Sequence, residues 1–172
     1  MKKLIFIRHG RAEDQVAGIS DFERSLTVKG KVISREMACR FKEKENKHGL
    51  LFITSPAFRA LETAYIFAGE FGIKPEEIQI DSNLYFRADI KHLITILNKT
   101  DKEIETIALF GHNPSITELP DRLCRDGCEF LTKTSIVCIS FPVSKWSELK
   151  TDSGKQEYFL KPVKKNEQDL YT

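Results

Sequence analysis

The chain has 172 residues, of which 41% are hydrophobic, and this is enough for one ordinary globular domain with a sizeable core. Its 27 basic and 25 acidic residues are mixed along the chain and leave a formal net charge of +2, so there is no overall basic field to attract nucleic acid or a membrane surface. Any preference for an anion must therefore be local.

The apolar run at the amino-terminal end is short. Leu4–Ile7 is apolar, but Arg8 ends the run far short of the apolar region of a secretory signal. Later segments do not approach the roughly 20 apolar residues that a membrane-spanning helix needs. We therefore expect a cytoplasmic protein that does not associate with membranes, in which Leu4–Ile7 forms the first strand.

Short apolar runs alternate along the chain with longer segments in which apolar residues recur at helical spacing. The predicted strands are Leu4–Ile7, Leu50–Ile53, Ile107–Phe110, Ile136–Phe141 and an edge strand at Glu157–Leu160. The predicted helices are Val28–Lys47, Pro56–Phe71, Asp89–Asn98 and Pro114–Arg125. This alternation predicts an α/β fold with a mainly parallel central sheet.

Three of the predicted helices begin with residues that favour helix initiation. Thr27 can cap the helix that starts at Val28. In Ser55-Pro56 and Asn113-Pro114 a good N-cap residue precedes proline at the first helical position, where the missing N–H costs nothing. These two helices are thus predicted to start directly after a strand. The segment Gly10–Leu26 is predicted to be a surface loop.

No internal repeat or low-complexity linker divides the chain. This predicts a single domain over residues 1–162. Residues 163–172 are polar and are predicted to form a tail without a chemical role.

The four cysteines are Cys39, Cys124, Cys128 and Cys138, and they form no C-x-x-C pair. Cys124 and Cys128 have the spacing of neighbours on one helix face, and buried thiols are the simplest interpretation of all four. The four histidines are scattered rather than grouped with the cysteines, so we expect neither a metal site nor another cofactor. Two of these histidines, His48 and His92, are expected to be ordinary surface residues.

Three predicted strands end in a similar way, with a basic residue close to a glycine or proline turn. The three turns are Arg8-His9-Gly10, Ser55-Pro56-Ala57-Phe58-Arg59 and Gly111-His112-Asn113-Pro114. In an open parallel sheet, ligands bind at the carboxyl ends of the strands. The three turns should therefore converge on one site if their strands are neighbours.

Two arginines, Arg8 and Arg59, and two histidines, His9 and His112, would share that site. The three turns contain no carboxylate, so grouping these side chains is unfavourable unless an anion satisfies them, and two helix amino-termini would add positive potential. Arg59 strengthens the case because a cation in the first turn of a helix opposes the helix dipole. The combination predicts a phosphate site.

The three turns resemble the signature sequences of the histidine phosphatase superfamily, with the second reading Ser55-Pro56-x-x-Arg59-Ala60-x-x-Thr63-Ala64. The resemblance runs from residue 3 to about residue 142. The small size, the segment Leu26-Thr27-x-x-Gly30 and the Gly-His-Asn-Pro turn resemble, more narrowly, the SixA-type protein-phosphohistidine phosphatases. The resemblance implies a three-layer α/β/α domain of the phosphoglycerate mutase-like type.

The resemblance also implies that His9 is the nucleophile, that Arg8 and Arg59 bind phosphate, and that His112 is the second histidine of the site. The chemistry agrees, because the guanidinium fork matches phosphoryl oxygens and a neutral imidazole can attack phosphorus without a metal. We expect the arginines and helix termini to keep His9 neutral, and the other nitrogen of His9 to donate to a backbone carbonyl. We expect His112 to donate to the phosphoryl oxygens.

The general acid that an ester substrate requires is not evident in the sequence. The candidates are Asp89, Glu13, Asp14 and Glu118. Asp89 is better explained as a helix cap, and the other three as surface carboxylates. Because an imidazole leaves more readily than an alkoxide, this gap favours a phosphohistidine substrate presented by a protein.

Two other functions remain open at this point. One is a phosphomonoesterase for a small phosphorylated metabolite, with one of these carboxylates as its acid; a mutase is less favoured, because few residues remain for an enclosing lid besides Gly10–Leu26. The other, from a different class, is a non-catalytic phosphate- or phosphoprotein-binding module that keeps the arginines but does not turn over substrate.

Overall fold

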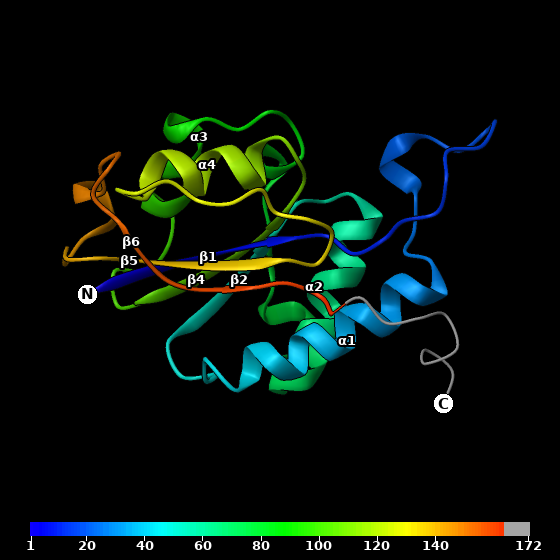
Figure 1. The fold of residues 1–172 in the computed structure, drawn as a ribbon, viewed down its shortest axis with the longest axis horizontal. Coiled ribbons are helices and arrows are strands. Elements are labelled where there is room, and N and C mark those ends of the chain that lie inside the picture. Colours follow the sequence, from blue (N-terminus) through cyan, green and yellow to red (C-terminus); the bar gives the residue numbers. More distant parts are fainter. Residues whose placement is uncertain (164–172) are drawn as a thin grey trace.

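A computed structural model describes residues 1–163 and shows a six-stranded sheet with the strand order β3-β2-β4-β1-β5-β6 (Figure 1). The strands are β1 (Lys2–Arg8), β2 (Leu50–Thr54), β3 (Gln79–Ile80), β4 (Thr106–Gly111), β5 (Ile136–Phe141) and β6 (Lys155–Leu160). The strands β1 to β4 run parallel to one another, while β5 pairs antiparallel with both β1 and β6. The predicted mainly parallel α/β fold is confirmed.

Helices cover both faces of the sheet, with α1 and α2 on one side and α3 and α4 on the other (Figure 1). The helices are α1 (Val28–Lys42), α2 (Phe58–Phe71), α3 (Ile90–Asn98) and α4 (Ser115–Leu123). Short 3₁₀ turns are η1 (Asp21–Glu23), η2 (Pro75–Glu77), η3 (Ser82–Leu84) and η4 (Trp146–Glu148). The three layers expected from the family resemblance are present.

The alternation of side chains along β1 supplies both halves of the core. Ile5 and Ile7 face the α1/α2 side, whereas Leu4 and Phe6 face the α3/α4 side, and all four are fully buried. The α1/α2 side is rich in aromatic rings, such as that of Phe41. Burial of each such side chain contributes about 1.5–3 kcal/mol, which fixes the strand ends that carry the site.

Two predicted helices end earlier in the structure than the sequence pattern suggested. The helix expected over Val28–Lys47 ends at Lys42, because Phe41 is its last buried apolar residue and the following residues, 43–47, are all polar or charged. The helix expected to end at Arg125 ends at Leu123, where the backbone turns extended at Cys124. Cys124 and Cys128, which have the spacing of neighbours on one helix face, both lie beyond the last residue of α4.

The cysteines are also less uniformly buried than expected. Cys124 and Cys138 are buried, but Cys128 is half-buried and Cys39 is exposed. Burial raises the pKa of the Cys138 thiol to about 12. The four residues remain free thiols in the structure.

The predicted cap at Thr27 is confirmed, since its Oγ1 accepts a hydrogen bond from the Gly30 backbone N–H at 2.9 Å. A glycine is required at position 30, because a Cβ there would lie 2.2 Å from the carbonyl oxygen of Arg11. The Leu26-Thr27-x-x-Gly30 segment thus lets the first helix press against the backbone that follows β1.

The other two predicted caps are wrong. The helix expected at Pro56 begins at Phe58 with Ala57 as its N-cap, while the Ser55 hydroxyl accepts a long bond of 3.4 Å from the Ala57 N–H and lies 2.8 Å from His112 Nε2. The helix expected at Pro114 begins at Ser115, and the Asn113 side chain accepts from the Thr117 hydroxyl at 2.8 Å rather than from a backbone N–H.

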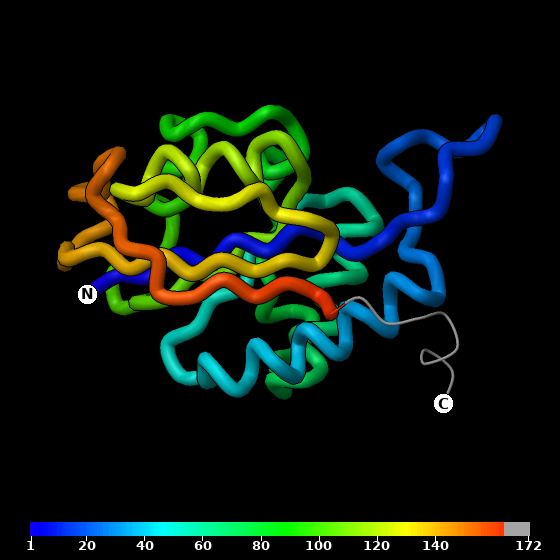
Figure 2. The backbone as a smooth tube through the Cα atoms, in the orientation of Figure 1, coloured from blue at the N-terminus to red at the C-terminus, as the bar shows by residue number. Residues whose placement is uncertain are grey.

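Residues Gly10–Leu26 form a loop that projects from the carboxyl end of β1 and returns beside the start of α1 (Figure 2). We call this segment the projecting loop. The segment is a surface loop as predicted, but it contains η1 and is closed by a bridge between Ala12 and Leu26. Within residues 1–163 no helix is long and apolar enough to cross a membrane. Of the predicted tail, residues 164–172 lie outside the described residues.

Candidate active site

The three turns singled out in the sequence lie side by side, because β4 lies between β1 and β2. Arg8 is paired with Gly111, and the His9 backbone N–H donates to the Gly111 carbonyl at 3.1 Å. On the other side of β4, the Ser55 N–H donates to the Phe110 carbonyl at 2.9 Å. The carboxyl ends of these three neighbouring strands therefore meet at one edge of the sheet.

His9 lies directly after β1 and is 8% exposed. Its Nδ1 is 2.7 Å from the carbonyl oxygen of Gly10. A carbonyl only accepts, so Nδ1 carries the proton and Nε2 keeps its lone pair. The hydrogen bond expected from the second nitrogen of His9 is present.

The pKa of His9 is lowered to about 3, so the ring is neutral at physiological pH. Burial is the main cause, and the charges of Arg59, Arg8 and Lys133 add to it against the opposing hydrogen bond to Gly10. His9 is therefore neutral, as expected. The expected cause was incomplete, because burial lowers the pKa of His9 more than the charges of the neighbouring cations do.

His112 packs against His9 with the two ring centroids 4.9 Å apart, and it is 9% exposed. Its Nε2 lies 2.8 Å from Ser55 Oγ, which also accepts from the Ala57 N–H at 3.4 Å. We assign the Ser55 hydroxyl as the donor to Nε2, which leaves the ring proton on Nδ1. Burial, followed by the charges of His9 and Arg59, lowers the pKa of His112 to about 3.

Arg59 is the second residue of α2 and is 7% exposed. Its Nη1 donates to the backbone carbonyl of Asp21, and its Nη2 donates to the Asp21 carboxylate at 2.8 Å. Asp21 lies outside the three turns and was not among the expected site residues, since it comes from η1 in the projecting loop. The guanidinium group of Arg59 is therefore held in place by its hydrogen bonds to Asp21 of the projecting loop.

Asp21 also accepts from Arg24 Nη1 at 2.8 Å and, more weakly, from the Tyr85 hydroxyl at 3.4 Å. Partial burial alone would raise the pKa of Asp21, but the hydrogen bonds from Arg24 and Arg59 outweigh it and lower the pKa. The carboxyl group is thus ionised at neutral pH.

Arg8, at the end of β1, is half-buried and donates from Nη1 to the Leu131 carbonyl at 2.9 Å. Its guanidinium carbon lies 5.7 Å from the centre of the Phe130 ring. Two buried nitrogen atoms of the site, Arg8 Nε and His112 Nδ1, have no hydrogen-bond partner among residues 1–163. We refer to Arg8, His9, Arg59 and His112 as the four-residue cluster.

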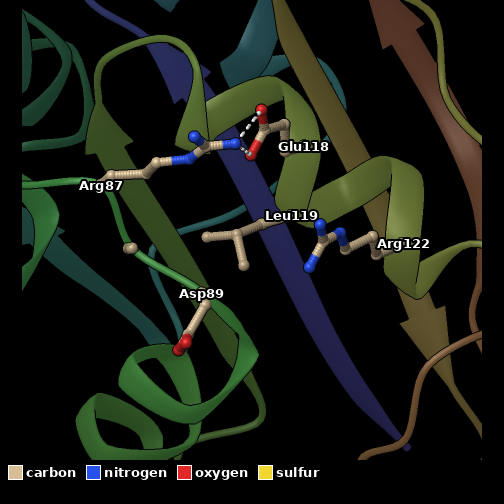
Figure 3. Close-up of a pocket in the computed structure, with 6 residues that line it drawn as sticks. Arg87, Asp89, Glu118, Leu119 and Arg122 are labelled. Carbon is tan, nitrogen blue, oxygen red and sulfur yellow. Dashed lines mark hydrogen bonds and ion pairs between the residues drawn. The ribbon is translucent and has the colours of Figure 1, made fainter.

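The carboxylates considered as general acids contact none of these four residues. Asp89 caps α3, accepting from the His92 N–H at 3.0 Å, as predicted. Glu118 pairs with Arg87 at 3.0 Å. Both line a separate hollow of about 290 Å³ between α3 and α4 (Figure 3).

The remaining candidates in the sequence are surface residues. Glu13 and Asp14 are exposed on the projecting loop, and Glu13 accepts from Arg24 only through its backbone carbonyl. His48 and His92 are exposed, and His92 pairs with Asp89 at 2.8 Å. Among residues 1–163 no three His, Cys, Asp or Glu side chains are grouped so that they could hold a metal ion.

Comparison with known proteins gives a family match and one relative. Residues 4–85 match the family described as histidine phosphatase superfamily, branch 1. An uncharacterized protein of Picosynechococcus sp. is 32% identical over 121 residues, which cover 67% of this chain and 69% of that protein.

Several solved structures share the fold. A proposed phosphohistidine phosphatase SixA from Nakamurella multipartitia matches with a TM-score of 0.75 and 18% identity, covering 95% of this chain and 97% of that one. The protein histidine phosphatase SixA complexed with tungstate matches with a TM-score of 0.74 and 22% identity, over 93% and 97%. A mycobacterial glucosyl-3-phosphoglycerate phosphatase matches with a TM-score of 0.64 and 12% identity, over 91% and 97%. At these identities the similarity is one of fold.

Proposed function

The chain belongs to the histidine phosphatase superfamily, and from this premise we propose that it accepts a phosphoryl group on His9 and acts on protein phosphohistidine. The observation that carries the proposal is the state of His9: it is neutral, its Nδ1 proton is held by Gly10, and its Nε2 is free to attack. We further propose that residues 1–162 form the single catalytic domain.

In the first step, His9 Nε2 attacks phosphorus and the P–N bond of the substrate breaks. The substrate imidazole leaves as a neutral ring when its second nitrogen already carries a proton, so the protein need not supply one. The phosphorylated His9 ring is cationic, because Nδ1 keeps its proton and donates it to the Gly10 carbonyl. In the second step, water attacks phosphorus and His9 leaves as the neutral ring from which it started.

Arg8, Arg59 and His112 bind the phosphoryl oxygens in this proposal. A buried N–H without a partner costs about 1–3 kcal/mol, and a phosphoryl group brings acceptors for Arg8 Nε and His112 Nδ1. Phosphoryl transfer depends mostly on positioning and on compensation of negative charge. N–H donors that are in place before the substrate binds provide both the positioning and the compensation of negative charge.

The ionisation of Asp21 supports phosphohistidine as the substrate. An alkoxide leaving group needs a proton from a general acid, whereas Asp21, the carboxylate in contact with Arg59, is ionised at neutral pH. Asp89 and Glu118 are engaged elsewhere. A leaving group that needs no proton from the protein fits this arrangement best.

A phosphomonoesterase for a small metabolite is the second candidate. It is supported by the shared fold of the mycobacterial glucosyl-3-phosphoglycerate phosphatase, whose substrate is a phosphate ester. The same four-residue cluster would serve both reactions, and the two candidates differ in the leaving group.

Substrate profiling separates these candidates. We expect kcat/KM for phosphoimidazole and for a phosphohistidine peptide to exceed that for glycerol phosphate and sugar phosphates by at least a hundredfold. Faster hydrolysis of the sugar phosphates would reject the phosphohistidine assignment in favour of the esterase.

Rapid quench with ³²P-labelled phosphoimidazole tests the nucleophile. Label should appear in acid-labile, base-stable form on the wild type and be absent from His9→Ala, which should lose turnover while its circular dichroism spectrum is unchanged. Label on a residue other than His9 would reject the nucleophile assignment. Binding of phosphate without turnover of any phosphodonor would instead identify a non-catalytic binding module.

A further inference from the structure

Four aromatic rings connect the four-residue cluster to the protein surface. Tyr85 lies edge-on to His112 with centroids 5.8 Å apart, and it contacts Phe22 at 5.4 Å and Phe86 at 5.3 Å. Phe22 in turn contacts Phe58 at 5.9 Å. We name Phe22, Phe58, Tyr85 and Phe86 the aromatic rim.

The outer members of the aromatic rim are exposed to solvent. Phe86 is 69% exposed and Phe58 is 42% exposed, although both are large apolar side chains. Exposed rings that lie together beside a reactive group are a common mark of an interaction surface. A partner that covers these rings gains the free energy of burying the apolar area that is still exposed.

Three cations lie close to the four-residue cluster, two of them on the two arms of the projecting loop. The backbone N–H of Glu13 on one arm donates to the carbonyl of Ser25 on the other at 2.9 Å. Arg11 and Arg24 therefore lie on adjacent stretches of backbone. Lys133 precedes Thr134, whose N–H donates to the carbonyls of Arg8 and His9 at 3.1 and 3.3 Å. We name Arg11, Arg24 and Lys133 the basic cluster.

The charges of the basic cluster act on one another. Partial burial, followed by the charges of Arg8, Arg11 and Arg24, lowers the pKa of Lys133, and the carboxylate of Asp14 opposes this shift. The side chain of Arg11 has no hydrogen-bond or ion-pair partner within residues 1–163. An acidic partner would relieve this repulsion.

The hollow of Figure 3 extends the same surface, since Arg87 directly follows Phe86. Arg87 and Arg122 both lie along its wall, and Arg122 is exposed. Asp89 and Glu118 line the hollow as well, so it adds apolar contact and hydrogen-bonding groups on this side of the rim but no net positive charge.

We infer that the aromatic rim and the basic cluster form a docking surface for a protein substrate, one whose phosphohistidine is flanked by apolar and acidic side chains. The inference rests on the proposed function and narrows its substrate class. The rings offer few hydrogen-bonding atoms, so the hydroxyls of a sugar leaving group would lose water there without replacement. An apolar protein surface has no such hydrogen bonds with water to lose.

Two phosphohistidine peptides of equal length test the docking surface, with phosphoimidazole as a reference that carries the same P–N bond. One peptide has leucine and glutamate around the phosphohistidine, and the other has serine and lysine. For the wild type we expect kcat/KM for the first peptide to exceed that for the second at least tenfold. This preference should shrink as ionic strength rises.

Variants assign the preference to the named residues. Phe86→Ala and Phe58→Ala should each lower the ratio of kcat/KM for the first peptide to that for phosphoimidazole by about tenfold. Arg11→Glu should lower the preference for the acidic peptide in the same way. Tyr65→Ala is the matched control, because Tyr65 is 43% exposed on the same helix as Phe58 but contacts no member of the rim, and its ratio should equal that of the wild type.

The outcomes separate the two levels of the proposal. Turnover of phosphoimidazole with equal rates for both peptides, or with ratios unchanged in the rim variants, rejects the docking surface and leaves the proposed function standing. An equal loss on phosphoimidazole and on the peptides also rejects docking, because the rim would then bind small rings. Turnover of neither phosphoimidazole nor peptides by the wild type rejects both.

Discussion

Arg59 and Asp21, which are 38 positions apart, are joined by two hydrogen bonds, one to the backbone carbonyl and one to the carboxylate of Asp21. Two contacts on one guanidinium fix the plane of the fork as well as its position. The projecting loop thereby sets the orientation of an arginine whose backbone belongs to α2.

Asp21→Asn should impair catalysis more than anion binding. The variant weakens the hold on Arg59, but it also removes a negative charge beside the site, so the two effects on phosphate affinity oppose each other. We expect kcat to fall about tenfold while the inhibition constant of inorganic phosphate changes less than threefold. Steady-state kinetics with phosphoimidazole gives both values.

Asp14→Asn is the control for this variant, because it removes the same charge from an exposed residue of the same loop. Its kcat should match the wild type. An equal loss of kcat in the two variants would mean that net charge, and not the hydrogen bonds between Asp21 and Arg59, determines the rate.

Ser55→Ala should change the proton position on His112. The Ser55 hydroxyl donates to Nε2 and so keeps the proton on Nδ1. Without it we expect a mixture of tautomers in the ¹⁵N NMR spectrum of His112 and a kcat reduced about tenfold. Ser115→Ala removes another buried hydroxyl, one that accepts from the Ala88 N–H, and should leave the His112 signals in place. A spectrum of Ser55→Ala identical to that of the wild type would contradict the assignment.

Stability should decrease with acidification because His9 and His112 are neutral in the fold. Their pKa values are about 3 when folded, against about 6.5 when unfolded, so the unfolded chain binds more protons between these limits. The free energy of unfolding is therefore fully retained above pH 6.5 and falls as the pH drops below it. At pH 5 the loss is about 2 kcal/mol for each histidine.

Urea unfolding at pH 7 and pH 5 measures this loss, and comparison with His9→Asn isolates the part due to His9 from the titration of carboxylates. We expect the variant to lose about 2 kcal/mol less than the wild type between the two pH values. The same loss in both proteins would show that His9 does not resist protonation in the fold.

Gly30→Ala should destabilise the protein, whereas Gly69→Ala should not. A Cβ at position 30 would lie 2.2 Å from the Arg11 carbonyl oxygen, and α1 would have to move away from the backbone that follows His9. We expect a loss of about 1–3 kcal/mol. At position 69 nothing lies within 4 Å, and alanine should add up to about 1 kcal/mol because it favours helix more than glycine does. Thermal unfolding of both variants distinguishes a local clash from a general effect of alanine.

Much of the site arrangement was predictable because it follows from strand order. The carboxyl ends of parallel strands share an edge, so residues that follow β1, β2 and β4 were expected to meet if these strands were neighbours. Their apolar runs were visible because each strand is buried on both faces. By contrast, β3 has only two residues, both exposed, and gave no such pattern.

The partners of the arginine and of the second histidine were not predictable in this way. Asp21 lies in a loop without periodicity, and its contact with Arg59 depends on the path of that loop in space. Serine before proline often caps a helix, but the shorter contact of the Ser55 hydroxyl is with His112 at 2.8 Å, and its bond with the Ala57 N–H is 3.4 Å long. Local rules describe such residues poorly where a tertiary contact competes for the same atom.

Thr63 links two parts of the four-residue cluster: its hydroxyl donates to the Arg59 carbonyl at 2.6 Å and accepts from the Gly10 N–H at 3.0 Å. One side chain therefore ties the backbone next to the nucleophile to the first turns of α2. The aromatic rim and the basic cluster, in contrast, are drawn largely from connecting segments. Substitutions that retarget the protein to another substrate can accumulate there during evolution while the geometry of the reacting atoms is inherited unchanged.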